Sequence, residues 1–323
     1  MAEQIQLPPP SGSGVAFVTG GFGFLGAAAA TALKTAGWRV AAIGHPPHPP
    51  PGPRVDASFA GEVGEPAFAH MMERIGVPDL VFHAAGGASV GASLANAGRD
   101  RSRTVDSLRR TLEFLSTRAP QARLIYPSSA AVYGSAHDGP IPETAPLAPI
   151  SPYGVHKAQA EALIAEAAAE FGLRAVILRF FSIYGPGLRK QLLWELSNRL
   201  AAAPAQVELA GAGAERRDFL YIDDALALIG LAAGLPPGRE PLVLNGGSGQ
   251  PASVREIAEG LAAAMGGRSR IVFGGQVREG DPKSLVADIS RAEALGFAPA
   301  VPLQTGLERV ARWFASLPAG SSA

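Results

Sequence analysis

Short apolar runs alternate along the chain with longer segments whose apolar residues recur at helical spacing. The runs predict buried strands at residues 15–19, 39–43, 79–84, 123–126 and 174–179. The helical pattern between them predicts helices over 27–36, 92–117 and 153–171. Strands that alternate with helices indicate βαβ units with right-handed crossovers. The expected fold class is therefore α/β, with a Rossmann-type doubly wound parallel sheet.

The alternation loosens after residue 185 and indicates a second, smaller α/β lobe. In this lobe we expect a strand at 207–209 and helices at 189–203, 253–265 and 303–317. A strand at 242–245 is expected to return to the main sheet, so the two parts are interleaved along the chain. Residues 45–53 read HPPHPPPGP, which is typical of a stiff polyproline-like loop.

The amino-acid composition argues against several classes of protein. Its 323 residues are 47% apolar and 17% charged, which permits a sizeable core and argues against global disorder. Lys plus Arg equals Asp plus Glu at 28 each, so the basic surplus of a nucleic-acid binder is missing. The absence of cysteine excludes disulfides, thiolate metal sites and a cysteine nucleophile, and it suits a cytoplasmic protein. Neither a secretory signal nor a membrane-spanning stretch is expected.

Residues 19–26, TGGFGFLG, follow the first strand and open a helix. Gly21, Gly23 and Gly26 fit the pattern G-x-G-x-x-G, and Gly20, Gly23 and Gly26 fit G-x-x-G-x-x-G. Glycines permit the tight turn and let a pyrophosphate approach bare backbone, while the helix N-terminus offers unpaired N–H groups to phosphates. The segment predicts a dinucleotide site, to which we assign Gly20, Gly23, Phe24, Leu25 and Gly26.

The residues at the end of the second strand do not decide between NAD and NADP as the coenzyme. A dinucleotide site usually has an acidic residue there to hold the adenosine ribose. This chain has Gly44 and His45 instead. His45, His48 or Arg54 could face a 2′-phosphate, and the proline-rich loop could equally serve only as a spacer.

A second motif supplies candidate acid–base chemistry. Residues 151–157, SPYGVHK, place Tyr153 and Lys157 four positions apart, on one face of a helix that Pro152 would begin. A nearby ammonium and an oxidised nicotinamide would favour the Tyr153 phenolate. Ser129, in the segment PSSAAVYG after a strand, could hold a substrate oxygen while Tyr153 moves its proton.

Together these motifs make the chain similar to extended short-chain dehydrogenase/reductases of the NAD-dependent epimerase/dehydratase family, and to UDP-glucose/galactose 4-epimerases in particular. The resemblance covers about residues 14 to 315. Its ordered motifs are TGGFGFLG, FHAAG (82–86), PSSAAVYG (127–134), SPYGVHK, LRFFSIYGPG (178–187), RRDFLYIDDA (216–225) and REGD (278–281).

The resemblance implies roles for individual residues. Ser129, Tyr153 and Lys157 match the catalytic Ser/Thr, Tyr and Lys, and Tyr153 and Lys157 would also contact the nicotinamide ribose region. It adds to the cofactor site Glu62, which would meet adenine, together with His45, Ala84, Ala85, Gly86 and Phe180. It assigns to the substrate Ser89, Ser129, Phe181, Ser182, Arg217, Arg278 and Asp281.

Some positions depart from the family pattern. The 4,6-dehydratases carry an Asp-Glu pair directly after the catalytic Ser/Thr, whereas this chain has Ala130 and Ala131, which transfer no proton. Ser182 replaces a usual Asn, Ala88 a lysine frequent in the 4-epimerases, and Thr104 a common Asn. These changes argue against a 4,6-dehydratase and leave the sugar undefined.

The expected function is that of a nucleotide-sugar 4-epimerase, which acts on a UDP-hexose through a transient 4-keto intermediate with bound NAD. One alternative is an NADPH-dependent 4-keto-nucleotide-sugar reductase. Another, of a different class, is a catalytically idle dinucleotide sensor. The family analogy also implies a homodimer through the helices near 92–117 and 153–171.

We expect a dinucleotide-binding domain of residues 14–187, to which 217–250 return. Residues 188–216 and 251–317 would form the smaller substrate-binding domain, with flexible ends at 1–13 and 318–323. No metal site is expected, since His70, His137 and His156 lack metal-ligand spacing, and His83 lies in an apolar strand as a core histidine.

Overall fold

A computed structural model describes residues 9, 14–45, 55–135, 137–236, 238–275 and 283–318. Its centre is a seven-stranded, fully parallel sheet with the strand order β10-β6-β5-β4-β1-β2-β3. The strands are β1 (Val15–Thr19), β2 (Arg39–Gly44), β3 (Ala57–Ala60), β4 (Leu80–His83), β5 (Arg123–Ser129), β6 (Arg174–Phe180) and β10 (Leu242–Gly246). The doubly wound parallel sheet predicted from the sequence is confirmed.

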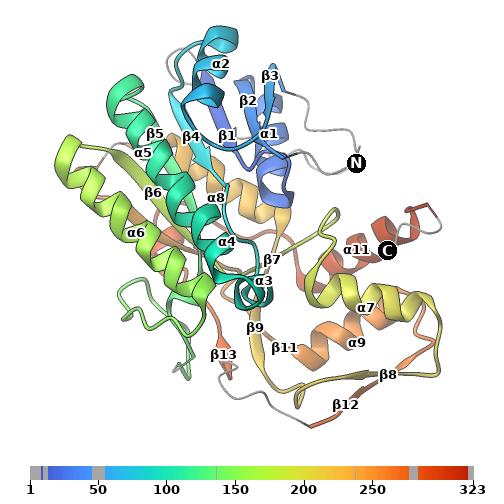
Figure 1. Ribbon diagram of the computed structural model, residues 1–323. Coiled ribbons are helices and arrows are strands. Elements are labelled where there is room, and N and C mark those ends of the chain that lie inside the picture. The colour runs from blue at the N-terminus through green and yellow to red at the C-terminus, as the bar shows by residue number, and fades with distance from the viewer. Residues whose placement is uncertain are drawn as a thin grey trace.

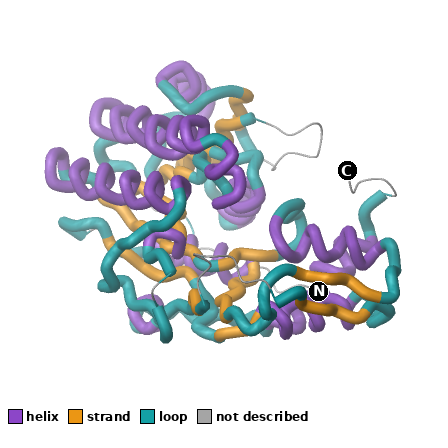
Figure 2. Tube along the Cα trace, turned by 60° about the horizontal axis from the view of Figure 1, so that its bottom comes forward, coloured by secondary structure: helices purple, strands orange, loops and turns teal. Residues whose placement is uncertain are grey.

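Helices cover both faces of this sheet (Figures 1 and 2). Apolar side chains of α1 (Phe24–Thr35) and α8 (Ile222–Gly234) pack on one face. Those of α2 (Glu65–Ile75), α5 (Ser107–Arg118) and α6 (Pro152–Phe171) pack on the other. Burial on both faces explains why the central strands were visible in the sequence as apolar runs. The sequence did not predict β3, whose residues alternate between half-buried and exposed.

The smaller lobe lies beside the sheet, at the lower right of Figure 1. It contains α7 (Gln191–Ala201), α9 (Val254–Ala264), α11 (Leu303–Ala315) and the parallel pair β8 (Gln206–Leu209) and β12 (Arg270–Phe273). A small sheet lies between the two parts, in which β9 (Arg216–Tyr221) pairs with β7 (Ser182–Tyr184), β11 (Pro251–Ser253) and β13 (Ser284–Leu285). α10 (Ser290–Glu293) contacts β10.

One apolar core joins the two parts of the molecule. Leu33 on α1 and Leu228 on α8 belong to the same buried cluster as Leu196, Ile257 and Leu307 on the three lobe helices. The lobe is therefore packed against the α1 and α8 face of the sheet.

One expectation about local structure is wrong. The predicted helix 92–117 is divided into α3 (Val90–Ala95), α4 (Ala97–Arg101), a π-helical turn (Ser102–Asp106) and α5. Asn96 ends α3, and its side-chain oxygen accepts a hydrogen bond from the Arg99 N–H to begin α4. The Asp223-Asp224 pair lies in the first turn of α8 but does not cap the helix. Instead, the Asp224 carboxylate accepts hydrogen bonds from the N–H groups of Ala300 and Val301, just before α11.

Candidate active site

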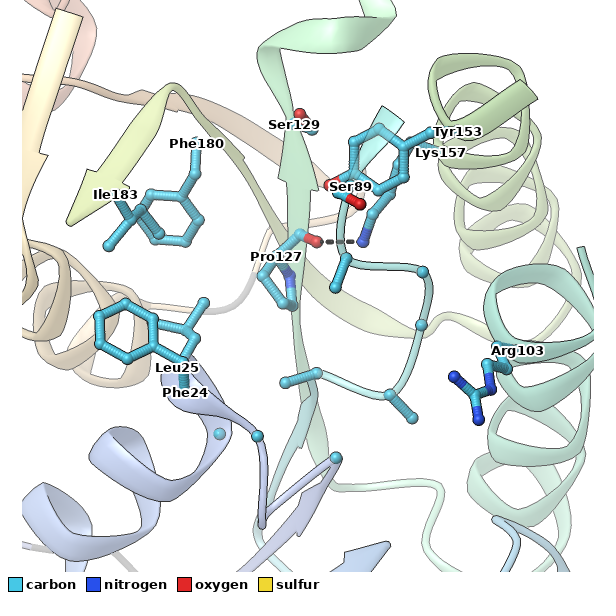
Figure 3. A pocket seen from close by; sticks show the side chains of 18 of the residues that line it. Phe24, Leu25, Ser89, Arg103, Pro127, Ser129, Tyr153, Lys157, Phe180 and Ile183 are labelled. Carbon is cyan, nitrogen blue, oxygen red and sulfur yellow. Dashed lines mark hydrogen bonds between the residues drawn. The ribbon is translucent and has the colours of Figure 1, made fainter. Parts of the chain in front are cut away.

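The sheet leaves a crevice where its connections change direction. From β1 the chain continues to β2 and β3 on one side, and β4 returns to the other side of β1. In such sheets ligands bind at the carboxyl ends of the strands at this point. A cavity of about 630 Å³ lies there. Figure 3 shows side chains from its wall.

The glycine loop forms one end of the cavity. α1 begins at Phe24, and its N-cap, Gly23, provides no side-chain cap; the first turn also lacks an acidic residue. The N–H groups of this turn are therefore free to bind phosphate oxygens. Gly20 has a φ of +64°, and a Cβ on Gly26 would lie 2.2 Å from the Gly20 carbonyl oxygen, so the turn requires glycine at both positions.

The loop after β4 forms the cavity's floor. Thr19 accepts hydrogen bonds at its carbonyl oxygen from the Ala84 N–H (3.0 Å) and at its hydroxyl from the Ala85 N–H (3.2 Å). The Gly87 N–H donates to the hydroxyl of Thr104, 2.9 Å away on the π-helical turn. Thr104, which occupies a usual Asn position, thus anchors the segment that carries Gly86.

Beyond the end of β2, His45 and Glu62 face each other at the cavity's rim. His45 Nε2 lies 3.0 Å from Glu62 Oε1, and both side chains are exposed. Glu62 thus places a carboxylate close to the end of β2, where the Gly61 N–H donates to the Gly44 carbonyl oxygen at 2.9 Å. His48 and Arg54 lie outside the described residues.

The Ser, Tyr and Lys candidates meet at the other end of the cavity. Ser129 ends β5, and Tyr153 and Lys157 lie on the first two turns of α6. Ser151 caps this helix by accepting a hydrogen bond from the Gly154 N–H, and Pro152 occupies its first position. The Ser129 and Tyr153 side chains both line this end of the cavity, and the Ser129 hydroxyl interacts with the Tyr153 phenol closely enough to lower its pKa. Lys157 Nζ donates to the Pro127 carbonyl oxygen, 2.7 Å away (Figure 3).

The substrate candidates divide into three groups. Ser89, Phe181 and Ser182 line the main cavity, as does the cofactor candidate Phe180. Arg217 lies apart from them, in a neighbouring hollow of about 190 Å³. The two spaces share the residues Ser182, Ile183, Leu188, Lys190 and Gln191. Arg278 and Asp281 lie outside the described residues.

Comparison with known proteins identifies the family. The sequence model of the NAD dependent epimerase/dehydratase family matches residues 16–243. The chain belongs to the NAD-dependent epimerase/dehydratase family. Membership makes it an NAD-dependent enzyme, and the cavity's uncapped helix N-terminus and glycine loop fit that cofactor.

Individual relatives are similar over almost their full length. A UDP-glucose 4-epimerase of Azospirillum brasilense is 32% identical, over 93% of this chain and 92% of its own. A UDP-glucose 4-epimerase of Thermotoga maritima, solved with UDP-glucose, has a TM-score of 0.83 and 27% identity over 93% of this chain and 98% of its own. One of Thermus thermophilus, in complex with NAD, has a TM-score of 0.82 and 25% identity over 94% and 99%.

In this member of the epimerase/dehydratase family, burial dominates the acid–base properties of the site. Burial raises the pKa of Tyr153; the interaction with the Ser129 hydroxyl lowers it by a smaller amount, and the charge of Asp100 raises it further. Burial also lowers the pKa of Lys157 to about 8, although the charges of Asp100 and Glu161 raise it. In the chain alone burial therefore outweighs the nearby ammonium, which was expected to favour the Tyr153 phenolate together with an oxidised nicotinamide. The positive charge that arrives with oxidised NAD must supply the remaining stabilisation.

Buried polar pairs connect α6, the helix that carries Tyr153 and Lys157, to α4 and to β6. His156 Nδ1 lies 2.6 Å from Asp100 Oδ2, which joins α6 to α4. Glu161 of α6 pairs with Arg179 of β6 at 2.7 Å and accepts a hydrogen bond from Ser128. His83 is fully buried among the hydroxyls of three residues, so its expected role as a core histidine is confirmed; these are Thr19, Ser107 and Thr111.

Sequence reasoning missed two basic residues of the cavity wall, Arg103 and Lys190. Arg103 lies on the π-helical turn and points toward the cavity (Figure 3). Lys190 Nζ donates to the Ala88 carbonyl oxygen at 3.3 Å, and burial lowers its pKa. Lys190 follows the YGPG motif, which could have drawn attention to it. Arg103 had no comparable signal, because the π-helical turn that orients it was not visible in the sequence.

No described helix is long and apolar enough to cross a membrane. Within the described parts of the chain, no group of three His, Asp or Glu side chains could hold a metal ion.

Proposed function

We propose that the chain is a nucleotide-sugar 4-epimerase that acts on a UDP-hexose with bound NAD. The proposal is supported by the proximity of Ser129, Tyr153 and Lys157 at one end of the cavity. The other end is formed by the glycine loop, which is of a type that binds phosphate. It is also supported by relatives that carry this activity in their names.

The chain's residues would act around the sugar C4 hydroxyl. Tyr153 takes the hydroxyl proton as C4 becomes a ketone, and Ser129 donates a hydrogen bond to the same oxygen. Lys157 stabilises the negative charge of Tyr153. When bound by the glycine loop and the segment after β4, NAD would supply a reversible hydride acceptor for C4. After the keto sugar has rotated in the cavity, Tyr153 returns its proton to the oxygen, and the C4 epimer is released.

The observation that favours epimerisation within this family is the pair Ala130 and Ala131. Both line the cavity directly after Ser129, where 4,6-dehydratases carry an acid and a base. Methyl groups cannot protonate a leaving C6 hydroxyl or remove a C5 proton. With Phe181 and Leu285 they add an apolar wall, along which a keto sugar can turn without breaking strong hydrogen bonds.

The proposal also assigns one end of the cavity to the cofactor and the other to the substrate. The cofactor end comprises the glycine loop, the segment that follows β4, and Glu62. The Glu62 carboxylate would repel a 2′-phosphate, which favours NAD over NADP. The substrate diphosphate would lie between Lys190 and Arg217, where the two spaces meet.

We further propose residues 14–187, with 217–250, as the cofactor-binding domain and the remaining segments of 188–317 as the substrate-binding domain. The chain would work in the cytoplasm as a homodimer joined through α5 and α6. These helices lie side by side on the outer face of the sheet (Figure 1), and Ala162 and Ala165 of α6 are exposed.

Proton NMR of the purified protein with a panel of UDP- and GDP-hexoses, and with no added cofactor, tests the function. We expect the C4 epimer of one UDP-hexose to appear, since an epimerase regenerates its bound NAD in each cycle. Tyr153→Phe should lower kcat by a factor of about 100 or more, with UDP binding retained. Tyr221→Phe, which removes a hydroxyl outside both cavities, serves as the matched control.

Other results would identify the alternatives. Turnover of a 4-keto sugar nucleotide with NADPH, in the absence of epimerisation, would replace the proposal by the reductase. Inertness toward every sugar nucleotide, combined with tight cofactor binding, would favour a dinucleotide sensor. A Tyr153→Phe variant that retains most of its activity would rule out the assigned proton transfer.

A further inference from the structure

The Lys157 ammonium lies in an enclosed environment with few partners. The residue is 5% exposed. An ammonium has three donors, and among the described residues only the Pro127 carbonyl oxygen accepts one of them. The remaining protein stabilisation of this charge comes from groups that do not hydrogen-bond to it, among them the carboxylates of Asp100 and Glu161, whose charges raise the pKa of Lys157.

The acidic groups that face Lys157 are already paired with other residues. Asp100, from α4, lies 2.6 Å from His156, and Glu161, on α6 itself, is bound by Arg179 and Ser128. The other titratable groups facing Lys157 are Tyr153 on α6, His83 on β4 and Tyr126 on β5. Of these, His83 is held neutral, because burial and the Lys157 charge lower its pKa to about 3.

Tyr126 offers the ammonium an aromatic face. Lys157 Nζ lies 4.6 Å from the centre of the Tyr126 ring, compared with 5.9 Å from that of Tyr153. A cation within about 6 Å of a ring face is attracted by the ring quadrupole, most strongly where water is excluded. Tyr126 directly precedes Pro127, so one strand provides both the aromatic face and the carbonyl acceptor for this charge.

The Tyr126 ring is fixed in place, and its hydroxyl is not used. The side chain is fully buried, and His83 stacks on it with ring centres 6.1 Å apart. The hydroxyl has no hydrogen-bond partner among the described residues. The part of Tyr126 that serves the site is therefore its ring face.

We propose that Tyr126 is a positioning residue, whose aromatic face holds the Lys157 ammonium in place and in its charged form beside Tyr153. Its relevance to catalysis rests on the proposed function, because Lys157 is assigned there to stabilise the Tyr153 phenolate. No sugar or cofactor needs to contact Tyr126 for this role.

Lysine NMR tests the proposal directly. The sequence contains only four lysines, so protein labelled with ¹³C at lysine Cε gives four signals, and the signal missing from Lys157→Met assigns Lys157. The pKa of Lys157 is measured in the wild type, in Tyr126→Phe, in Tyr126→Leu, and with 3,4,5-trifluorophenylalanine at position 126. The fluorinated ring keeps the shape of phenylalanine but loses most of the negative charge on its face.

We expect Tyr126→Phe to titrate close to the wild type. The fluorinated and Tyr126→Leu proteins should titrate about 1 pH unit lower. Equal pKa values with phenylalanine and its fluorinated analogue would overturn the proposal, as would a fall in Tyr126→Phe as large as in Tyr126→Leu. Should Tyr126→Leu fail to fold, the two phenylalanine proteins, which match in shape, decide the question.

Activity provides a second readout. The alkaline limb of the kcat/KM profile for the UDP-hexose should move to lower pH by the same amount in the fluorinated protein. Phe68→Leu, which removes a fully buried ring from the same apolar core, should leave this limb unchanged. Absence of epimerisation would refute the proposed function alone, because the lysine titration requires no substrate.

Discussion

Burial acts in opposite directions on the two side chains assigned to proton chemistry. It raises the pKa of the Tyr153 phenol and lowers that of the Lys157 ammonium, so the neutral form of both gains weight in the chain alone. The site is therefore poised for a ligand that brings charge. A cationic nicotinamide favours the phenolate, which in turn favours the ammonium.

The buried lysine makes the stability of the protein depend on pH. The pKa of Lys157 is about 8 in the folded chain, against an ordinary value of 10.5. Below pH 8 the folded state carries the full cost of the buried charge. Between pH 8 and 10.5 the unfolded chain still binds the proton that the folded chain has released, so stability rises with pH.

Relative to Lys157→Met, the wild type should therefore gain about 3 kcal/mol in free energy of unfolding between pH 7 and 10. Urea unfolding of both proteins at a series of pH values measures this difference, and titrating groups that do not interact with Lys157 cancel in the comparison. A difference that stays constant with pH would contradict the assigned pKa.

At this scale the sequence supplied the identity and spacing of the reacting groups but not their surroundings. Tyr153 and Lys157 were recognisable because four positions equal one helical turn. Tyr126 and Asp100 were not, because their effect on Lys157 depends on how β5 and α4 pack against α6.

Among the elements, α1 is held in position by a close approach of two backbone segments. Its first turn touches the preceding loop, where Gly26 faces the carbonyl of Gly20. Any side chain on Gly26 must displace either the helix or the loop, and the free N–H groups of the helix would move with it.

Gly26→Ala should therefore lower the free energy of unfolding by about 1–3 kcal/mol and reduce the amount of NAD that copurifies. Gly91→Ala, in α3, is the matched control. A Cβ at Gly91 meets nothing within 4 Å, so this substitution should be neutral or stabilise by up to about 1 kcal/mol. Thermal unfolding and the absorbance of released cofactor measure both effects. Normal NAD content in Gly26→Ala would contradict the assigned phosphate site.

The division of the predicted helix 92–117 shows that helical periodicity predicts the presence of helix but not the positions at which the helix is interrupted. The helical periodicity is present throughout, but Asn96 bonds to the backbone locally and interrupts the helix. The π-helical turn that follows carries Arg103 to the cavity. On the same turn, Thr104 accepts a hydrogen bond from the Gly87 N–H, although the two residues lie 17 positions apart.

Across the whole molecule, the outer face of α5 and α6 is the proposed dimer surface. Exposed alanines such as Ala162 and Ala165 would allow two copies of α6 to approach closely.

Ala162→Arg should convert the dimer to a monomer, because the long charged side chain would be buried between the helices without a partner. Light scattering coupled to size-exclusion chromatography measures the mass. Ala315→Arg, at an exposed position of α11, is the control and should keep the dimer. A wild-type protein that elutes as a monomer, or an Ala162→Arg variant that stays dimeric, would refute this surface.

The sequence by itself determined the parallel sheet, the glycine loop and the Ser, Tyr and Lys set, because each depends on residues that are close together in the sequence. The sheet follows from apolar runs, the loop from glycines in one turn, and the Tyr and Lys pair from a spacing of one helical turn. Only the tertiary structure decided which residues complete the site. Arg103, Lys190 and Tyr126 reach it through packing between segments distant in sequence, and the same burial sets the charge states on which the chemistry depends.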